Sequence, residues 1–180
     1  KSAKSVGLDV PTQEICCFAT DPSFISAHVD LLRKQLDGFG GQEKVRLLFS
    51  AHGLPVSIIA KGDPYQWQIE QSVEAIVKQL DRPGLDWTIC YQSRVTRVEW
   101  LGPSTESEIE RAGREGVGLV VTPIAFVSEH SETLVELDIE YGELAQKHRV
   151  PRYERVQALG VHHLFIEAME NLVCAAVVSD

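Results

Sequence analysis

Cysteine is scarce in this sequence, and no cysteine sits in a recognisable metal-binding or redox pattern. The 180 residues include four cysteines, Cys16, Cys17, Cys90 and Cys174. No C-x-x-C pair and no H-E-x-x-H motif occurs, and two adjacent cysteines make a poor disulfide pair. Cys90 lies in an apolar stretch and is expected to be a small core residue. We therefore expect a reducing compartment and no structural or preformed zinc site.

Long apolar runs and positive charge are scarce as well. No run reaches the ~18 apolar residues of a membrane span, and the N-terminus leads into no apolar signal segment. The formal net charge of −9, without a basic patch, argues against nucleic acid as a partner and suits a cationic ligand or simply a soluble acidic protein. We expect a cytoplasmic protein and leave peripheral membrane association open. A start at Lys1 suggests a fragment or a processed chain.

What the sequence does contain is a regular alternation of strands and helices. Strands are predicted at 45–51, 87–91, 117–127 and 153–159, and helices at 21–36, 65–80, 106–114, after 127, and at 164–177. Such alternation indicates a parallel sheet with helices on both faces. We predict one α/β domain over residues 1–180, a three-layer α/β/α fold around a four-stranded parallel sheet. The fourth strand is the most polar and is expected at an edge.

The last predicted helix carries apolar side chains at the spacing of a buried face. They are Phe165, Ile166, Met169, Leu172 and Val173. We expect this face to pack on the core.

The densest group of ionisable side chains follows the third predicted strand. Ser128 is predicted to cap a helix there, and we also assign Ser131 a capping role, because neither serine has a nucleophile-elbow setting. Glu132, Glu136 and Glu140 are four residues apart and therefore form one carboxylate stripe on a helix. A solvated acidic face is the simplest interpretation of such a stripe.

His130 adds a second ionisable group to this helix. His130 and Glu132 lie about 200° apart on a regular helix, so they can face one cavity only if the first turn is irregular or a π-bulge is present. Leu134 and Leu137 point elsewhere and can anchor the helix to the sheet.

Three predicted strands end in polar groups at the same edge of the sheet. His52 ends the first strand, residues 92–94 end the second, and His130 with Glu132 follows the third. Ligands bind at this edge in open α/β sheets. Two histidines with several carboxylates can bind a divalent metal or pass protons.

The individual roles at this edge have more than one interpretation. The imidazole of His52 suits proton transfer near neutral pH, although a loop carbonyl could equally well satisfy it. Gly53 lets backbone or a flat ligand come close. Arg94 could neutralise a ligand carboxylate or pair with an acid of this chain.

The glycines between 113 and 118 do not form a nucleotide-binding loop. They precede a strand, whereas a dinucleotide fingerprint follows a strand and opens a helix. No G-x-x-x-x-G-K-[ST] motif occurs either. We therefore do not expect nucleotide binding.

Five blocks of sequence carry a resemblance to a known family. They are LFSAHGLP (48–55), GDPY (62–65), YQSRV (91–95), WLGP (100–103) and PIAFVSEHSETLVELDIEY (123–141). Together they resemble ferrochelatase, over a match from about Cys17 to about Val173 in which the last block is highly specific. The similarity is to the C-terminal half of that enzyme, which has two Rossmann-like domains of the type II chelatase kind with the active site between them. It implies that the N-terminal domain is absent from this chain.

The resemblance implies an activity and roles for five residues. Ferrochelatase inserts Fe²⁺ into protoporphyrin IX, which gives protoheme in heme biosynthesis and releases two protons. His52 matches the active-site histidine that takes pyrrole protons or meets the metal, and Glu132 matches its acidic partner across the pocket. His130 matches a second histidine, and Glu136 and Glu140 match carboxylates along a path to solvent, on a helix with a π-type distortion. Whether His52 or the acidic helix delivers the metal stays open.

The resemblance also bears on cofactors and partners. It implies a porphyrin and a divalent metal as substrates, with Fe²⁺ as the metal, and no required cofactor. Some members bind a [2Fe–2S] cluster through a Cys-rich extension, but Cys174 stands alone, so no cluster is expected. Trp100 and Leu101 are candidates for lining an apolar slot, and a core role suits them equally. We expect an isolated half to be weakly active or inactive.

One departure and two alternatives remain. The family usually reads Ser-Arg/Lys-Val-Gly-Pro where this chain has SRVTR (93–97), so the local turn is not carried over. One alternative is a related chelatase that acts on coproporphyrin or a cobalt-dependent tetrapyrrole. The other is a non-catalytic metal- or heme-binding module that uses the same His and Glu residues.

Overall fold

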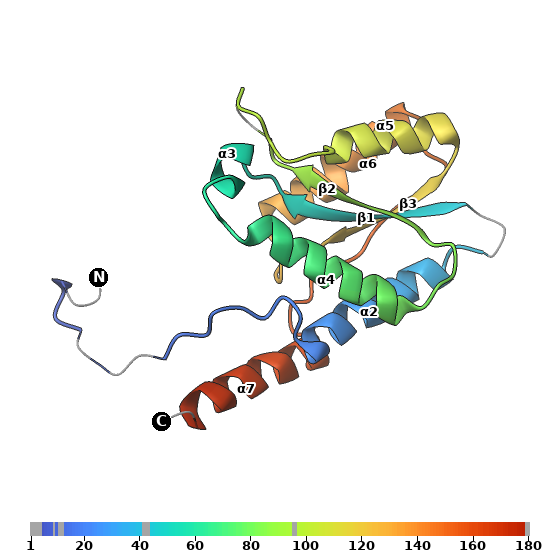
Figure 1. The fold of residues 1–180 in the computed structure, drawn as a ribbon. Helices are drawn as coiled ribbons and strands as arrows, with labels where there is room; N and C mark the ends of the chain where they lie inside the picture. The colour runs from blue at the N-terminus through green and yellow to red at the C-terminus, as the bar shows by residue number, and fades with distance from the viewer. Residues whose placement is uncertain (1–4, 9, 11–12, 41–43, 95–96, 179–180) are drawn as a thin grey trace.

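A four-stranded parallel sheet forms the centre of the computed structural model, which describes residues 5–8, 10, 13–40, 44–94 and 97–178 (Figure 1). The strands run in the spatial order β2-β1-β3-β4. They are β1 (Val45–His52), β2 (Asp86–Gln92), β3 (Gly118–Pro123) and β4 (Tyr153–Arg155). All three pairings are parallel, and β4 lies at an edge, as its polarity predicts.

Helices cover both faces of the sheet, which confirms the predicted three-layer α/β/α architecture (Figure 1). On one face lie α2 (Pro22–Asp37), α4 (Tyr65–Leu80) and α7 (His163–Val178). On the other lie α5 (Thr105–Glu115), the π-helix η1 (Glu132–Glu140) and α6 (Tyr141–Lys147). A single helical turn, α3 (Val56–Ile59), follows β1 and was not predicted. Every helix in the described ranges is too short or too polar to span a bilayer.

The two hydrophobic cores follow from the alternation of side chains along β1. Leu47 and Phe49 pack with α2 and α4, whereas Leu48 faces the helices of the other layer. All three are fully buried, because successive side chains of a strand point to opposite faces and both faces are covered. The middle of this central strand, residues 47–49, is therefore continuously apolar, and His52 comes at its end.

Local capping explains where the flanking helices start. The carboxylate of Asp21 accepts the N–H of Phe24 at 2.9 Å, and Pro22 occupies the first turn of α2, as the sequence predicts. The hydroxyl of Ser104 accepts the N–H of Ser107 at the start of α5.

Two strands end earlier than predicted. β3 stops at Pro123, and the N–H of Phe126 turns back to the Pro123 carbonyl, so residues 124–127 form a loop. Ile124 in this loop is buried in the core, so the loop sequence is apolar like the strand before it. This apolar composition explains why the sequence predicted a longer strand. β4 stops at Arg155, although the N–H of Val156 still bonds to the Val121 carbonyl.

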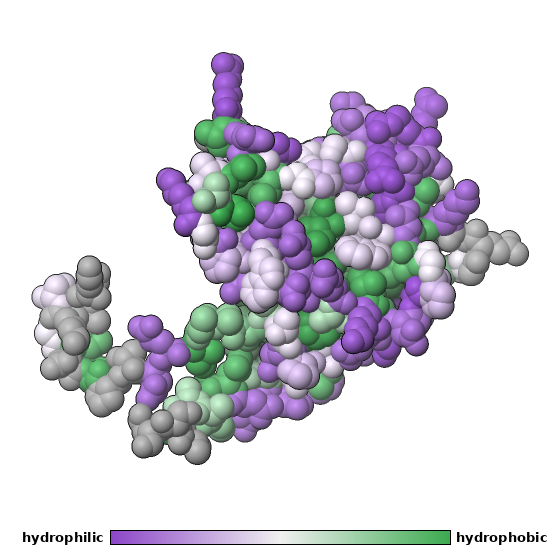
Figure 2. All heavy atoms as spheres, viewed as in Figure 1, coloured by the Kyte–Doolittle hydropathy of each residue, from purple (hydrophilic) through white to green (hydrophobic). Residues whose placement is uncertain are grey.

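The apolar face predicted for α7 is only partly buried. Phe165 and Ala168 pack in the core, whereas Ile166 and Val173 are about half exposed, at 49% and 54%. Figure 2 shows an apolar region at the lower left of the molecule, where α7 lies. The prediction of a core role for Ile166 and Val173 is therefore wrong for this chain.

The two leucines of η1 have unequal surroundings. Leu137 is fully buried against β3 and α5, whereas Leu134 is 47% exposed. The predicted anchoring role therefore holds for Leu137 alone.

We predict that Leu137→Ala lowers the free energy of unfolding by about 3 kcal/mol, since a buried leucine leaves a cavity. Leu134→Ala serves as the matched control and should cost less than about 1 kcal/mol. Urea unfolding of both variants measures the difference, and equal losses would contradict the anchoring role of Leu137.

His28 is a buried base inside α2. It is 3% exposed, and its Nε2 has no hydrogen-bond partner within the described residues. Burial, with a smaller contribution from His162, lowers the pKa of His28 to about 3. The unfolded chain, with an ordinary pKa near 6.5, therefore binds more protons than the folded chain below that pH.

We predict that this histidine makes the fold acid-sensitive. Stability should fall between pH 7.5 and pH 5 by about 2 kcal/mol more in the parent chain than in His28→Leu, at about 1.4 kcal/mol per pH unit once the unfolded histidine is protonated. Urea unfolding at both pH values measures this. His148→Gln is the control, because it removes a partly exposed histidine at the end of α6. Parallel slopes for parent and His28→Leu would show the prediction to be wrong.

Candidate functional site

The ends of β1, β2 and β3 meet at one edge of the sheet and border a cavity. His52 pairs with Gln92 in the β1–β2 register, and Ser50 pairs with Pro123 in the β1–β3 register. The cavity has a volume of about 580 Å³ and is lined by His52, Ser93, Trp100, Ser131, Glu132, Val135, Glu136 and Glu140. The structure thus brings His52 and the carboxylate stripe together, as their positions in the sequence predict.

His52 and Glu132 form the central contact of the cavity. Nδ1 of His52 lies 2.8 Å from Oε2 of Glu132, and both side chains are more than a third exposed. The hydroxyl of Tyr65 donates to the backbone carbonyl of His52 at 2.9 Å, which fixes the end of β1. A carboxylate can only accept, so the neutral imidazole carries its proton on Nδ1 and leaves Nε2 as a base. The two groups touch, rather than facing each other across the pocket.

The helix after β3 is a π-helix over all nine residues of η1. The N–H of Tyr141 bonds to the carbonyl of Glu136, five residues back. This geometry brings Glu132, Glu136 and Glu140 to the cavity wall, so the distortion implied by the resemblance is present. Glu140 is exposed at the outer end of the row.

The start of η1 differs from the prediction. The helical segment begins at Ser131, three residues after Ser128, and the Ser131 hydroxyl makes no capping bond. Instead, the N–H of His130 donates to Thr133 Oγ1 at 2.9 Å, and Thr133 Oγ1 donates to the His130 carbonyl at 3.0 Å. The capping roles predicted for Ser128 and Ser131 are therefore wrong, because Thr133 reaches the backbone ahead of the helix.

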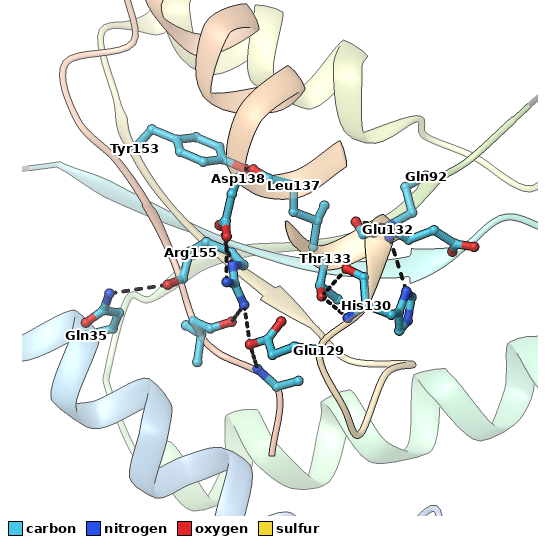
Figure 3. Close-up of polar contacts among 12 residues, drawn as sticks. Gln35, Gln92, Glu129, His130, Glu132, Thr133, Leu137, Asp138, Tyr153 and Arg155 are labelled. Atoms are coloured by element: carbon cyan, nitrogen blue, oxygen red, sulfur yellow. Dashed lines mark hydrogen bonds and ion pairs between the residues drawn. The ribbon is translucent and has the colours of Figure 1, made fainter. Parts of the chain in front are cut away.

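His130 lies beside the cavity rather than in its wall. Its Nδ1 accepts the N–H of Glu132 at 3.1 Å, so this ring orients the first residue of η1 (Figure 3). Its ring packs edge-on against Phe126, with 4.6 Å between centroids, and Phe126 also lies 6.2 Å from the ring of His52. One aromatic side chain thus contacts both histidines.

Glu136 is the most firmly held carboxylate of the row. It accepts the N–H and the hydroxyl of Ser93 at 2.8 and 2.5 Å, and the hydroxyl of Tyr141 at 2.8 Å. The amide of Gln92 lies 3.4 Å away. This carboxylate joins η1 to the end of β2, which the spacing of the glutamates alone does not reveal.

A buried polar chain lies beneath the cavity. Ser50 donates to the Gln92 side chain at 2.6 Å and lies 3.1 Å from the hydroxyl of Thr105, which contacts Cys90. Cys90 is fully buried, as predicted, and burial raises the pKa of its thiol to about 12. Sequence reasoning missed this chain, although a serine inside the apolar run of β1 is a signal for it.

The remaining predicted residues separate into lining and supporting groups. Trp100 lines the cavity, whereas Leu101 is 7% exposed and belongs to the core. A side chain at Gly53 would approach the Gln92 carbonyl to 2.8 Å, so this glycine serves a close backbone approach. Arg94 is exposed, does not line the cavity and makes no ion pair with any described residue. The turn expected to depart from the family includes residues 95–96, which lie outside the described residues.

Comparisons with known proteins agree with this geometry. A family profile described as Ferrochelatase matches residues 1–177. The ferrochelatase of Pelagibacter ubique is 51% identical over 164 residues, which cover 91% of this chain and 47% of that protein. The ferrochelatase of Rickettsia conorii is 47% identical over 170 residues, covering 94% and 48%. The ferrochelatase of Caulobacter vibrioides is 50% identical over 157 residues, covering 87% and 45%.

The chain therefore spans about half the length of the curated relatives that it matches. Among solved structures, SirB from Bacillus subtilis with Fe³⁺ superposes with a TM-score of 0.65 at 14% identity, over 97% of this chain and 62% of that one. At this identity the likeness supports the chelatase fold alone. The sequence relatives and the family profile, which covers almost every residue, show that this chain belongs to the ferrochelatase family.

Proposed function

We propose that this chain is the C-terminal domain of a ferrochelatase, which inserts Fe²⁺ into protoporphyrin IX and gives protoheme in heme biosynthesis. The observation that carries the proposal is the His52–Glu132 contact of 2.8 Å at the wall of an acidic cavity, in a chain that belongs to this family. Metal insertion needs a base for two pyrrole protons and a polar route for ions. The residues around this cavity supply both.

His52 is suited to the role of the base. Its Nδ1–H donates to Glu132, which holds the ring in one tautomer and stabilises the imidazolium that forms after proton uptake. The free Nε2 then accepts a proton from the macrocycle. Glu132, more than a third exposed, can take the second proton and release it to solvent.

The same two groups can hold the incoming ion. Two donor atoms about 2.1 Å from a divalent cation, at a right angle to each other, are about 3 Å apart. The separation of 2.8 Å between Nδ1 and Oε2 is close to this value. A cation would displace the proton between them, and that proton would move through solvent to Nε2 of the same ring. The ring would regain a free nitrogen for a pyrrole proton when the ion leaves Nδ1. We therefore propose that His52 and Glu132 receive Fe²⁺ together as its entry ligands before His52 acts as the base.

The remaining carboxylates form the proposed route between the pair and solvent. Glu136 is fixed by Ser93 and Tyr141, and the exposed Glu140 follows one step further out. His130 orients Glu132 through its backbone N–H and therefore acts on this route indirectly. For Arg94 we retain only a role near the porphyrin carboxylates, supported by its exposed position after β2.

The cavity has an apolar side that suits a flat ring. Trp100 and Val135 line it beside the ionisable groups. We propose that the N-terminal half, which the relatives' length implies, supplies the opposite wall.

No resident cofactor and no [2Fe–2S] cluster enter this proposal. The exposed free thiols of Cys16, Cys17 and Cys174 support a reducing, cytoplasmic location.

We predict that His52→Ala in the complete protein lowers the rate of porphyrin metallation at least about 100-fold, because it removes the base. His148→Ala is the matched control, since this histidine lies at the end of α6, remote from the cavity lining. Thermal unfolding should show that both variants stay folded. Turnover retained in His52→Ala would contradict the proposed role of His52 as the base.

The chain alone should show no metallation above the background reaction, because its cavity lacks one wall. Adding the N-terminal half of a ferrochelatase relative should restore turnover, measured with protoporphyrin IX and Fe²⁺ under anaerobic conditions. Coproporphyrin and Co²⁺ serve as comparison substrates. Stoichiometric binding of metal or porphyrin without turnover in the reconstituted protein would favour a non-catalytic binding module.

A further inference from the structure

The length of η1 demands a physical cause. π-Helices occur mostly as single turns inside α-helices, whereas η1 extends over nine residues. The three carboxylates depend on this geometry, because a return to about 3.6 residues per turn would rotate Glu140 relative to Glu132. Contacts from outside the helix must therefore favour the wider turn.

β4 supplies one contact at the critical carbonyl. In an α-helix the N–H of Tyr141 would bond to the carbonyl of Leu137, four residues back. That carbonyl instead accepts the hydroxyl of Tyr153 at 2.7 Å (Figure 3). The N–H of Tyr141 bonds to the carbonyl of Glu136. A side chain inserted into the i→i−4 ladder is a known cause of local helix distortion.

The Tyr153 hydroxyl is well suited to remain a donor. Burial raises the pKa of Tyr153 above its ordinary range, and the nearby Asp138 adds to the effect. A raised pKa keeps the phenol protonated, and therefore a hydrogen-bond donor, near neutral pH. Tyr153 lies opposite Leu119 in the β3–β4 register, so its position is set by the sheet.

Arg155 makes the second contact from the same strand. Its guanidinium forms a two-pronged bond with Asp138 of η1, with distances of 2.5 and 2.7 Å. A third nitrogen contact of 2.7 Å reaches Glu129, the residue before His130, and Glu129 also accepts the N–H of Ala158 (Figure 3). The side chain of Arg155 is only 11% exposed. One cation thus fixes both the loop before η1 and the middle of η1.

We propose that Tyr153 and Arg155 form a clamp, here named the β4 clamp, which keeps residues 132–140 in the π-helical register and so positions the carboxylate row in the cavity. The two are positioning residues, because neither lines the cavity. Tyr153 competes for the α-helical acceptor by occupying one of its two lone pairs, and Arg155 prevents the helix from rotating away from β4.

The bonds of Glu136 to Ser93 and Tyr141 are a competing explanation for the same register. They join η1 to the end of β2 and to Tyr141, whereas the β4 clamp joins η1 to β4. Removal of the Tyr153 hydroxyl leaves the Glu136 bonds in place, so it separates the two explanations.

The test uses the hydrogen-bond register itself. Couplings across hydrogen bonds are measured by NMR in the labelled chain, for the parent, Tyr153→Phe, Arg155→Lys and a control, Tyr91→Phe. Tyr91 is a buried tyrosine of β2 outside the cavity lining, so its variant controls for a lost phenol hydroxyl. The parent and Tyr91→Phe should show coupling between the Tyr141 nitrogen and the Glu136 carbonyl. In Tyr153→Phe this coupling should move to Leu137.

The second readout is cation binding, which rests on the proposed function. Co²⁺ titrated into the same samples should bind Tyr153→Phe and Arg155→Lys about 10-fold more weakly than Tyr91→Phe, the usual loss when a supporting contact is removed. Arg155→Lys keeps the charge but cannot form the two-pronged bond, so it should not rescue affinity.

The outcomes separate the two proposals. An unchanged Tyr141–Glu136 coupling in Tyr153→Phe would overturn the β4 clamp, whatever happens to stability. A shifted coupling with unchanged Co²⁺ affinity would overturn its positioning role. A parent chain that binds no Co²⁺ at the cavity would count against the proposed function, and the couplings would still decide on the clamp.

Discussion

The parallel pairing of β1 with both of its neighbours is the interaction from which the site follows. Residues on parallel strands that end together must project at the same edge, and here the register sets His52 beside Gln92 and Ser50 beside Pro123. The chain leaving β3 passes through the loop that begins at residue 124 into η1, which places the carboxylates at that edge. A shift of β1 by one residue would turn His52 away from Glu132 and would move Phe49 into the opposite core, where Leu48 now packs. The two cores and the site are therefore fixed by the same register.

A second constraint joins the sheet to η1 through polar groups. Gln92 is fully buried, and its side chain accepts from Ser50 below and approaches Glu136 above. Ser93 completes the link with two bonds to the Glu136 carboxylate. Buried polar networks are costly when broken and favour one arrangement when satisfied. This network therefore fixes the Glu136 carboxylate, and with it the cavity side of η1, relative to the end of β2.

The sequence allowed the sheet, its flanking layers and the meeting of His52 with the glutamate row to be predicted, because each rests on local patterns and on the rule that parallel strands end together. Three features could not be predicted. The extent of η1 depends on the Tyr153 hydroxyl, which is 16 residues away in sequence from Leu137. Thr133 bonds to the backbone ahead of η1 in place of Ser128 and Ser131, which the usual preference for serine as a cap had favoured. The apolar loop after Pro123 resembled a strand, because Ile124 packs into the core and its N–H still bonds to the Ser50 carbonyl of β1.

Charge balance explains how the proposed metal insertion could proceed at a site that contains only carboxylates and histidine as ionisable groups. Insertion exchanges one dication for two protons, so the total charge in the cavity is the same before and after the reaction. A row of carboxylates that attracts the ion is therefore equally suited to accept the protons that leave. The position of the weakly held donors then matters, since an ion that is bound too tightly would not pass to the macrocycle. Glu136, fixed by Ser93 and Tyr141, has few free lone pairs, whereas Glu132 and His52 share a single, easily replaced contact. The most loosely held pair of donors thus lies where transfer would occur, and the firmly held carboxylate keeps that pair in place.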